Sequence, residues 1–182
     1  MISVLGCIVS EHNVWLVGLA VVICGTGSWV TARLFHRTAR TQGLQLVGWH
    51  FLTALTAGAA TWCTHFIAML GFDAGVPVDF DPGLTAVSLM IAVVGSTVGF
   101  VLAGSGFSRF TPAIGGAVVG LSIAAMHYTG MMGYRVQGFV SWDVPFLVAS
   151  VVLSVALSAA ALHHAMQPIP HARNIMAGVL TL

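Results

Sequence analysis

Five long apolar stretches with almost no charge inside them constrain this chain more than any other feature. They cover roughly residues 13 to 33, 46 to 71, 83 to 105, 112 to 134 and 145 to 166. A helix of about 20 apolar residues crosses the hydrocarbon core of a bilayer. Because 58% of the 182 residues are hydrophobic and only 6% are charged, the lipid bilayer is the expected surrounding of the chain. We predict an all-α fold, a polytopic transmembrane helix bundle with five full spans.

A sixth apolar run begins near Asn174 and reaches Leu182, where the sequence stops. This run is less than half as long as a membrane span, and it predicts the beginning of a truncated sixth helix. We therefore expect residues 1–182 to form a single transmembrane domain that is truncated at its C-terminus and carries no output domain.

The placement of arginine predicts how the bundle is oriented, because short cytoplasmic loops are enriched in Lys and Arg. Five arginines fall on one side of the predicted spans, in the loops after the first, third and fifth: Arg33, Arg37, Arg40, Arg109 and Arg173. The opposite side holds Glu11, three aspartates of the loop after the second span, and Arg135 with Asp143. We therefore predict that the N-terminus lies outside and that the second and fourth spans run outward.

The charged residues exclude one class of partner. With six arginines, no lysine, five acidic residues and a formal charge of +1, the chain offers no basic stripe for nucleic acid. The three cysteines form no CxxC pair and are expected to pack in the bundle. No residue pattern indicates catalysis, so we do not expect an enzyme.

An internal repeat is the most informative local feature. The segment GAATWCTHFIAMLGF, residues 58–72, aligns without gaps on GLSIAAMHYTGMMGY, residues 120–134, at a constant offset of 62 in the numbering. His65 thereby matches His127, and Met69 matches Met131. A helix rise of about 1.5 Å per residue places both histidines on the order of 12 Å below the outer boundary. In each copy the methionine follows the histidine by four positions and lies on the same helix face.

This pattern predicts a shared metal site. Imidazole nitrogen and thioether sulfur suit copper, whereas Mg²⁺ and Ca²⁺ require oxygen ligands. An ionisable residue inside a membrane helix is a functional candidate by default. A packing role stays open, because such a histidine can be satisfied by an interhelical hydrogen bond and methionine fills gaps in cores. Two further alternatives are a b-type cytochrome, in which the two histidines clamp a haem, and a metal transporter.

Three other residues lie near the predicted site. His12, at the outer start of the first span, could approach it from outside. Tyr128 could donate a hydrogen bond to a bound ligand, whereas Phe66 at the matching position cannot. Cys63 lies on a different helix face from His65 and is expected to pack.

The second copy carries a specific motif, MHYTGM, from Met126 to Met131, and the first copy reads THFIAML at the matching place. The chain resembles the MHYT domain, a bacterial sensory module of the cytoplasmic membrane. The resemblance implies three such motifs near the outer face, with copper bound through their His and Met residues, Met126 included. It also implies sensing of a diatomic gas (O₂, CO or NO) or of redox state. A cytoplasmic signalling output domain or partner would follow, often one that makes or degrades cyclic di-GMP.

The chain departs from the family pattern in two places. Thr64 stands where the motif has methionine, so only His127 has a sulfur immediately before it. Adding the offset of 62 to His127 places a third histidine near position 189, beyond Leu182.

Overall fold

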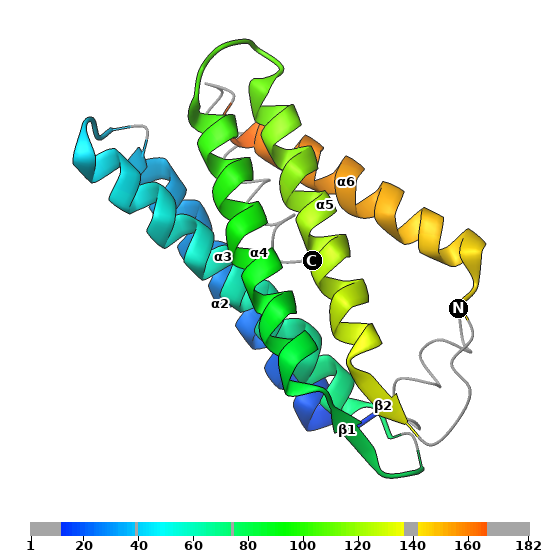
Figure 1. Ribbon diagram of the computed structural model, residues 1–182. Coiled ribbons are helices and arrows are strands. Elements are labelled where there is room, and N and C mark those ends of the chain that lie inside the picture. The colour runs from blue at the N-terminus through cyan, green and yellow to red at the C-terminus, as the bar shows by residue number, and fades with distance from the viewer. Residues whose placement is uncertain (1–11, 39, 74, 137–141, 167–182) are drawn as a thin grey trace.

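The computed structural model describes residues 12–38, 40–73, 75–136 and 142–166 (Figure 1). These residues form five helices: α2 (Val14–Thr38), α3 (Leu44–Gly71), α4 (Pro82–Gly104), α5 (Thr111–Met132) and α6 (Val144–Ala165). All five are long and apolar enough to cross a membrane, which confirms the predicted all-α bundle. The sixth apolar run, from Asn174, lies outside the described residues.

Each helix packs on its neighbours in the sequence, and α3 also contacts α5, while α6 crosses α5 obliquely (Figure 1). All five helices contribute to one buried cluster: Phe35, Ala54, Phe100, Ala103, Val119 and Leu162. Large apolar side chains also cover the outside; Val98, Leu153 and Leu157 are 53%, 58% and 60% exposed. An apolar exterior of this kind is what contact with lipid requires.

Glycines allow two helix pairs to pack closely. A Cβ added to Gly58 of α3 would lie 2.9 Å from the backbone of Val93 in α4. A Cβ added to Gly120 of α5 would lie 2.4 Å from the carbonyl oxygen of Ser154 in α6. Small residues where helices cross let the two backbones approach, which matters in lipid because no hydrophobic drive pushes them together. The same position of the sequence repeat therefore makes the same kind of crossing in both copies.

Aspartates start α4 and α6 in the same way. The Asp81 carboxylate accepts a hydrogen bond from the Leu84 amide at 3.0 Å, and the Asp143 carboxylate accepts one from the Phe146 amide at 3.4 Å. A proline follows in the first turn of each helix, where its missing N–H leaves no hydrogen bond unmade. Asp81 and Asp143 are related by the offset of the repeat, which therefore extends beyond the aligned motif.

The first helix is longer than predicted. We expected its end near residue 33 and placed Arg33 and Arg37 in the following loop, but α2 continues to Thr38 and contains both. The Arg33 guanidinium lies 4.5 Å from the Trp29 ring centre, and that of Arg37 lies 5.1 Å from the ring of Trp49. Cations are favoured in the last turn of a helix, and a long side chain can extend its charge toward water. The prediction of this boundary was therefore wrong.

A small sheet was not predicted. Strand β1 (Val78–Phe80) follows α3 and pairs antiparallel with β2 (Tyr134–Val136), which follows α5, so that Asp79 faces Arg135. The sheet joins the two loops that come directly after the repeated motifs (Figure 1). We call this end of the bundle the sheet end.

Candidate functional site

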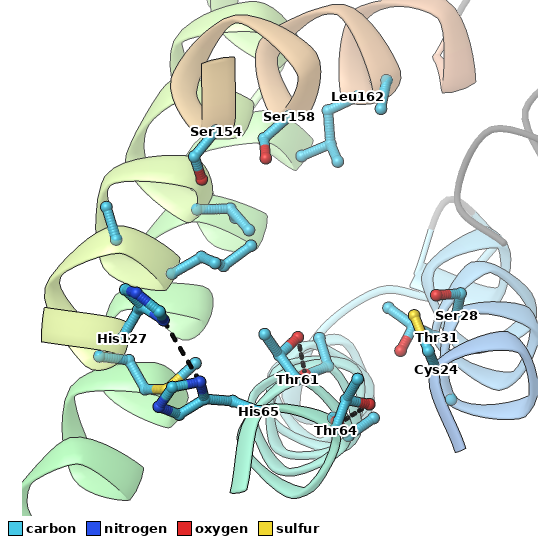
Figure 2. Close-up of a pocket in the computed structure, with 18 of the residues that line it drawn as sticks. Cys24, Ser28, Thr31, Thr61, Thr64, His65, His127, Ser154, Ser158 and Leu162 are labelled. Carbon is cyan, nitrogen blue, oxygen red and sulfur yellow. Dashed lines mark hydrogen bonds between the residues drawn. The ribbon is translucent and has the colours of Figure 1, made fainter. Parts of the chain in front are cut away.

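The two histidines of the repeat meet between α3 and α5, in the last two turns before the sheet end (Figure 2). The Nδ1 atoms of His65 and His127 are 3.3 Å apart, and the ring centres are 4.7 Å apart. One of these nitrogens must donate a proton to the other, since two lone pairs do not form a hydrogen bond. The structure thus brings together the two residues that the sequence repeat singles out.

Gly130 provides the space for this contact. A Cβ at this position of α5 would lie 3.0 Å from Nε2 of His65 and 3.3 Å from Cζ of Phe66. A side chain here would therefore push the His65 ring away from α5. The sequence analysis missed this role, although a glycine three positions after the histidine, where the first copy has Ala68, was the available signal.

The methionines of the predicted site are placed differently. Met126 is 1% exposed and lines the same cavity as His65 and His127. Met69 and Met131 are half-buried, lie one turn closer to the sheet end and do not line this cavity. Of the three predicted methionines, the structure places only Met126 on the cavity wall that also holds the two imidazoles.

The cavity has a volume of about 440 Å³ and lies between α2, α3, α5 and α6. Figure 2 shows His65 and His127 on one side of it, Ser154, Ser158 and Leu162 of α6 on another, and Cys24, Ser28 and Thr31 of α2 on a third. Two polar atoms that line it are buried without a hydrogen-bond partner among the described residues: Nε2 of His65 and Oγ1 of Thr31. Buried polar atoms are nearly always paired, so these two are free to bind a ligand or another segment.

Tyr128, which also lines the cavity, has its hydroxyl engaged. Its oxygen lies 2.5 Å from Oγ of Ser150 in α6. Because the Ser150 hydroxyl donates its proton to the carbonyl of Leu147 at 2.8 Å, Tyr128 is the donor in this pair. The hydroxyl that we expected to be available for a bound ligand therefore links α5 to α6.

His12 lies at the sheet end, away from the histidine pair. It forms an isolated backbone bridge with Phe72, just beyond the end of α3, and the two rings are 5.2 Å apart. The structure therefore does not bring His12 to His65. Cys63 does not line the cavity, as expected for a packing residue, whereas Cys24 lines it without a signal in the sequence.

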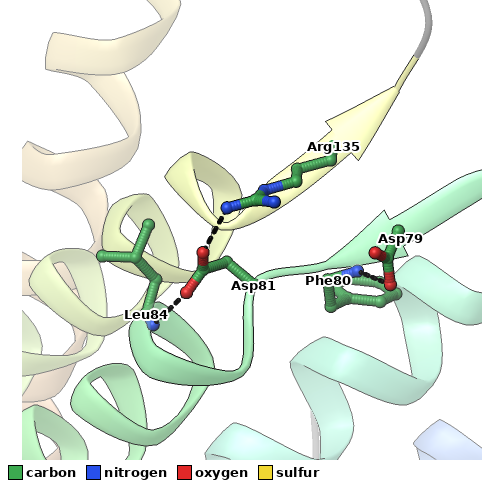
Figure 3. Close-up of polar contacts among 5 residues, drawn as sticks. All are labelled: Asp79, Phe80, Asp81, Leu84 and Arg135. Atoms are coloured by element: carbon green, nitrogen blue, oxygen red, sulfur yellow. Dashed lines mark hydrogen bonds and ion pairs between the residues drawn. The ribbon is translucent and has the colours of Figure 1, made fainter.

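An ion pair holds the loops above the site (Figure 3). The Asp81 carboxylate, which caps α4, also binds the guanidinium of Arg135 in β2. Its hydrogen bond from the Leu84 amide, and then the charge of Arg135, lower the pKa of the Asp81 carboxyl below its ordinary value. This carboxylate therefore fixes the start of α4 against the strand that follows α5.

The site offers few donor atoms. No group of three or more His, Cys, Asp or Glu residues that could hold a metal occurs in the part of the chain that the structure describes. A metal at this place would accordingly rely on the two imidazoles and on the sulfur of Met126. Such a set of nitrogen and thioether ligands suits copper better than a hard cation.

The fold and the site define a class: a multi-pass helical membrane domain with paired histidines inside it. A family model described as "Bacterial signalling protein N terminal repeat", MHYT, matches residues 58–116 and again residues 120–178. The chain belongs to the MHYT family and is a membrane sensory domain of signalling proteins. The start and the end of the second match follow those of the first at the offset of the sequence repeat.

Three curated proteins illustrate the relationship. The chain is 38% identical over 160 residues to an uncharacterized signaling protein of Caulobacter vibrioides, covering 88% of this chain and 20% of that protein. It is 31% identical over 158 residues to the Pseudomonas aeruginosa bifunctional diguanylate cyclase/cyclic di-GMP phosphodiesterase MucR, covering 85% of this chain and 23% of that protein. It is 35% identical over 127 residues to the cyclic di-GMP phosphodiesterase NbdA of the same organism, covering 69% of this chain and 16% of that protein. The chain thus spans about a fifth of the length of these relatives. No solved structure matches it.

Proposed function

We propose that this membrane sensory domain binds a copper ion near the outer face through His65, His127 and Met126. The observation that carries the proposal is the contact of two imidazoles from different helices, at 3.3 Å, on the cavity wall that also holds a fully buried methionine. The domain itself catalyses no reaction in this proposal. It changes the packing of its helices when the bound ligand or the redox state at its site changes.

The spacing of the ligands supports one shared ion. Histidine nitrogens bind first-row metals such as zinc at about 2 Å, so two nitrogens 3.3 Å apart can both reach the same ion. Nε2 of His65 is also buried without a hydrogen-bond partner among the described residues, and a buried polar atom costs free energy until it is paired. Met126 is the preferred sulfur ligand, ahead of Met69 and Met131, because it alone of the three lines the cavity.

The same distance argues against the b-type cytochrome. Axial histidines bind a haem iron from opposite faces, which places their nitrogens about 4 Å apart with the porphyrin plane between them. Rings whose centres are 4.7 Å apart, with facing nitrogens at 3.3 Å, leave no room for that plane. An optical spectrum distinguishes the two cofactors, because haem gives a Soret band.

Bound copper would supply a site for O₂, CO or NO, or a centre that changes redox state. The helices that carry the histidines are then the first elements to move. α3 packs on α4 through Gly58 and α5 packs on α6 through Gly120, so a change in the His65–His127 separation also displaces α4 and α6. A ligand that favours one separation over the other shifts the population of the two packings.

The arrangement also suggests where the signal goes. Arg37, Arg40 and Arg109 lie at the end opposite to the sheet, and arginine-rich ends face the cytoplasm. We therefore place the domain in the bacterial cytoplasmic (inner) membrane with its N-terminus and sheet end outside. By analogy with MucR and NbdA, whose names state cyclic di-GMP activities, the partner would be a cytoplasmic output domain that makes or degrades cyclic di-GMP.

Metal content tests the proposal. We expect the purified full chain to hold about one copper ion and no haem, and the double variant His65→Ala/His127→Ala to hold none. His164→Ala is the matched control, because His164 is an exposed histidine on α6. Equal copper in the parent and the double variant would refute the site. A Soret band with stoichiometric iron would show that the site binds haem and not copper.

Three methionine variants test the choice of sulfur. Leucine conserves the volume of methionine, and such exchanges in a core cost less than about 1.5 kcal/mol of stability. Met126→Leu should therefore keep the fold and lose copper affinity, whereas Met69→Leu and Met131→Leu should keep both. Unchanged affinity in Met126→Leu, measured by competition with a copper chelator, would remove Met126 from the site.

A further inference from the structure

The charges of the bundle are divided unevenly between its two ends. The aspartates of the described residues all lie on the side where α3 and α5 end: Asp73, Asp79, Asp81 and Asp143. At this end Arg135 is paired with Asp81, in the one ion pair of the described residues. The opposite end (Figure 1) holds four arginines and, within the described part of the chain, no carboxylate: Arg33, Arg37, Arg40 and Arg109. The described residues therefore supply no counter-charge to these arginines.

Two of these arginines are held in place by tryptophan rings. Trp29, Arg33 and Arg37 follow one another at intervals of four and lie on one face of α2. The Arg33 guanidinium carbon lies over the ring of Trp29, and that of Arg37 lies over the ring of Trp49, across the contact of α2 with α3. A guanidinium that stacks on an aromatic face keeps its N–H groups, which point outward in its plane, available for a ligand.

The surface around the two guanidinium groups is apolar. Trp29 is 52% exposed, and Val47 of α3, near Trp49, is 66% exposed. Tryptophan at such a position is typical of the boundary between bilayer and water. Arg33 precedes the last residue of α2, Thr38, by about 8 Å along the helix axis. A ligand that reaches both arginines therefore meets lipid-facing apolar surface as well as positive charge.

Phosphate is the group that best fits two fixed guanidinium planes. The N–H groups of arginine form paired hydrogen bonds with the oxygens of a phosphate. Side chains four residues apart on a helix start about 6 Å from each other, so one phosphate group can lie between them. An anionic phospholipid combines such a phosphate with acyl chains that cover apolar surface. A free phosphate ion lacks the acyl chains, and an acidic protein surface would approach from the water.

We propose that Arg33 and Arg37, oriented by Trp29 and Trp49, bind the phosphate of an anionic phospholipid where α2 packs on α3. The acyl chains then lie against the lipid-facing side of these two helices, and the headgroup joins α2 to α3 at the end opposite to the sheet. Anionic lipids of the cytoplasmic leaflet attract basic residues in this way. The proposal does not depend on which metal the histidine site binds.

Lipid binding to the purified full chain tests the proposal. Native mass spectrometry compares phosphatidylglycerol with phosphatidylcholine of the same acyl chains. The parent should bind its first phosphatidylglycerol at least about tenfold more tightly, and Arg33→Gln/Arg37→Gln should lose this preference. The matched control is Arg40→Gln/Arg109→Gln, which removes the same charge at the same end and should keep the preference. Equal losses in the two double variants, or no loss in Arg33→Gln/Arg37→Gln, would overturn the proposal.

Two further measurements separate a headgroup site from simpler attraction. Arg33→Lys/Arg37→Lys keeps both charges but replaces the planar groups that stack on the tryptophans, so part of the preference should be lost. This pair also covers the failure of the glutamine pair to fold, which the melting temperature of each variant reveals. An unchanged preference in the lysine pair would show attraction of charge alone and overturn the site. An excess of inorganic phosphate should not displace the lipid; displacement would make free phosphate the ligand.

Discussion

The α3–α4 pair and the α5–α6 pair are two copies of one unit, and their contacts can be compared position by position. Ser88 of α4 donates its hydroxyl to the carbonyl of Thr85 and accepts a hydrogen bond from the Trp62 indole of α3 at 3.0 Å. Ser150, at the matching position of α6, donates to Leu147 and accepts from Tyr128 of α5. The serine recurs at the same position, while the aromatic donor lies at a different one.

This difference shows how the two copies diverge in the side chains that they place at the cavity. Trp62 corresponds to Ala124, and Tyr128 corresponds to Phe66, so the donor lies one turn closer to the sheet end in the second copy. Tyr128 lines the cavity and Trp62 does not. Met126, which replaces Thr64, adds a sulfur on the same helix. The repeated contacts set the positions of the helices, and the residues that differ place the additional donor groups on α5.

The largest effect is expected where the two copies pack most closely. Gly120→Ala would put a Cβ 2.4 Å from the Ser154 oxygen, and Gly58→Ala would put one 2.9 Å from the backbone of Val93. Both must push two helices apart, and overpacking of this kind lowers the free energy of unfolding by about 1–3 kcal/mol. We expect the larger decrease for Gly120→Ala, measured as the melting temperature in detergent.

Gly18→Ala serves as the control for these two variants. No atom lies within 4 Å of a Cβ at Gly18, and alanine is the better helix former by about 1 kcal/mol. This variant should melt at the same temperature as the parent or above it. If all three variants lost the same stability, the close crossings would not be what holds the two copies together.

Gly130 tests the asymmetry of the site itself. Gly130→Ala should displace the His65 ring, because the new Cβ would lie 3.0 Å from its Nε2. Residues that orient a metal ligand typically change metal affinity by about 10- to 100-fold, and we expect a loss of that size in copper affinity. The reciprocal variant, Ala68→Gly, changes the exposed counterpart in α3 and should leave the affinity unchanged. A loss of similar size in Ala68→Gly would mean that the two positions are equivalent.

Much of the fold was predictable, because the length of an apolar stretch is read directly from the sequence. The end of α2 was not predictable. Arg33 stacks on Trp29 of the same helix and Arg37 stacks on Trp49 of α3, and the folded structure was needed to see that these contacts hold both charges on helical turns. The pairing of β1 with β2 was also missed. Three-residue strands carry too short an alternation to predict, and these two become neighbours only because α3 and α5 end side by side.

The site was predictable in part. The repeat identified His65 and His127 because two equal depths on two helices can be inferred from spacing alone. It could not identify which methionine shares their cavity, because that depends on how α3 and α5 are rotated against each other. The role of Gly130 depends on the same rotation, since the group that fills its space belongs to another helix.

The smallest effect concerns the two helix caps. Asp81 and Asp143 cap α4 and α6 alike, but only Asp81 has an arginine partner in the described residues. The pKa of Asp81 is lowered, so its ionised form favours the folded state. That contribution is present above the ordinary pKa of about 4 and is lost as the pH falls through the lowered value. Since Arg135 is 66% exposed, Arg135→Gln should reduce the melting temperature only slightly at neutral pH.

The difference between the parent and Arg135→Gln should shrink as the pH is lowered from 6 toward 3, because protonation removes the charge that Arg135 binds. Ionisations elsewhere in the chain occur in both proteins and cancel in this difference. Asp143→Asn supplies the comparison, because Asp143 has no arginine partner among the described residues. The change in melting temperature that Asp143→Asn causes should be the same in the parent and in Arg135→Gln. A difference between the parent and Arg135→Gln that stayed constant across this range would show that Arg135 stabilises the sheet end by packing and not through Asp81.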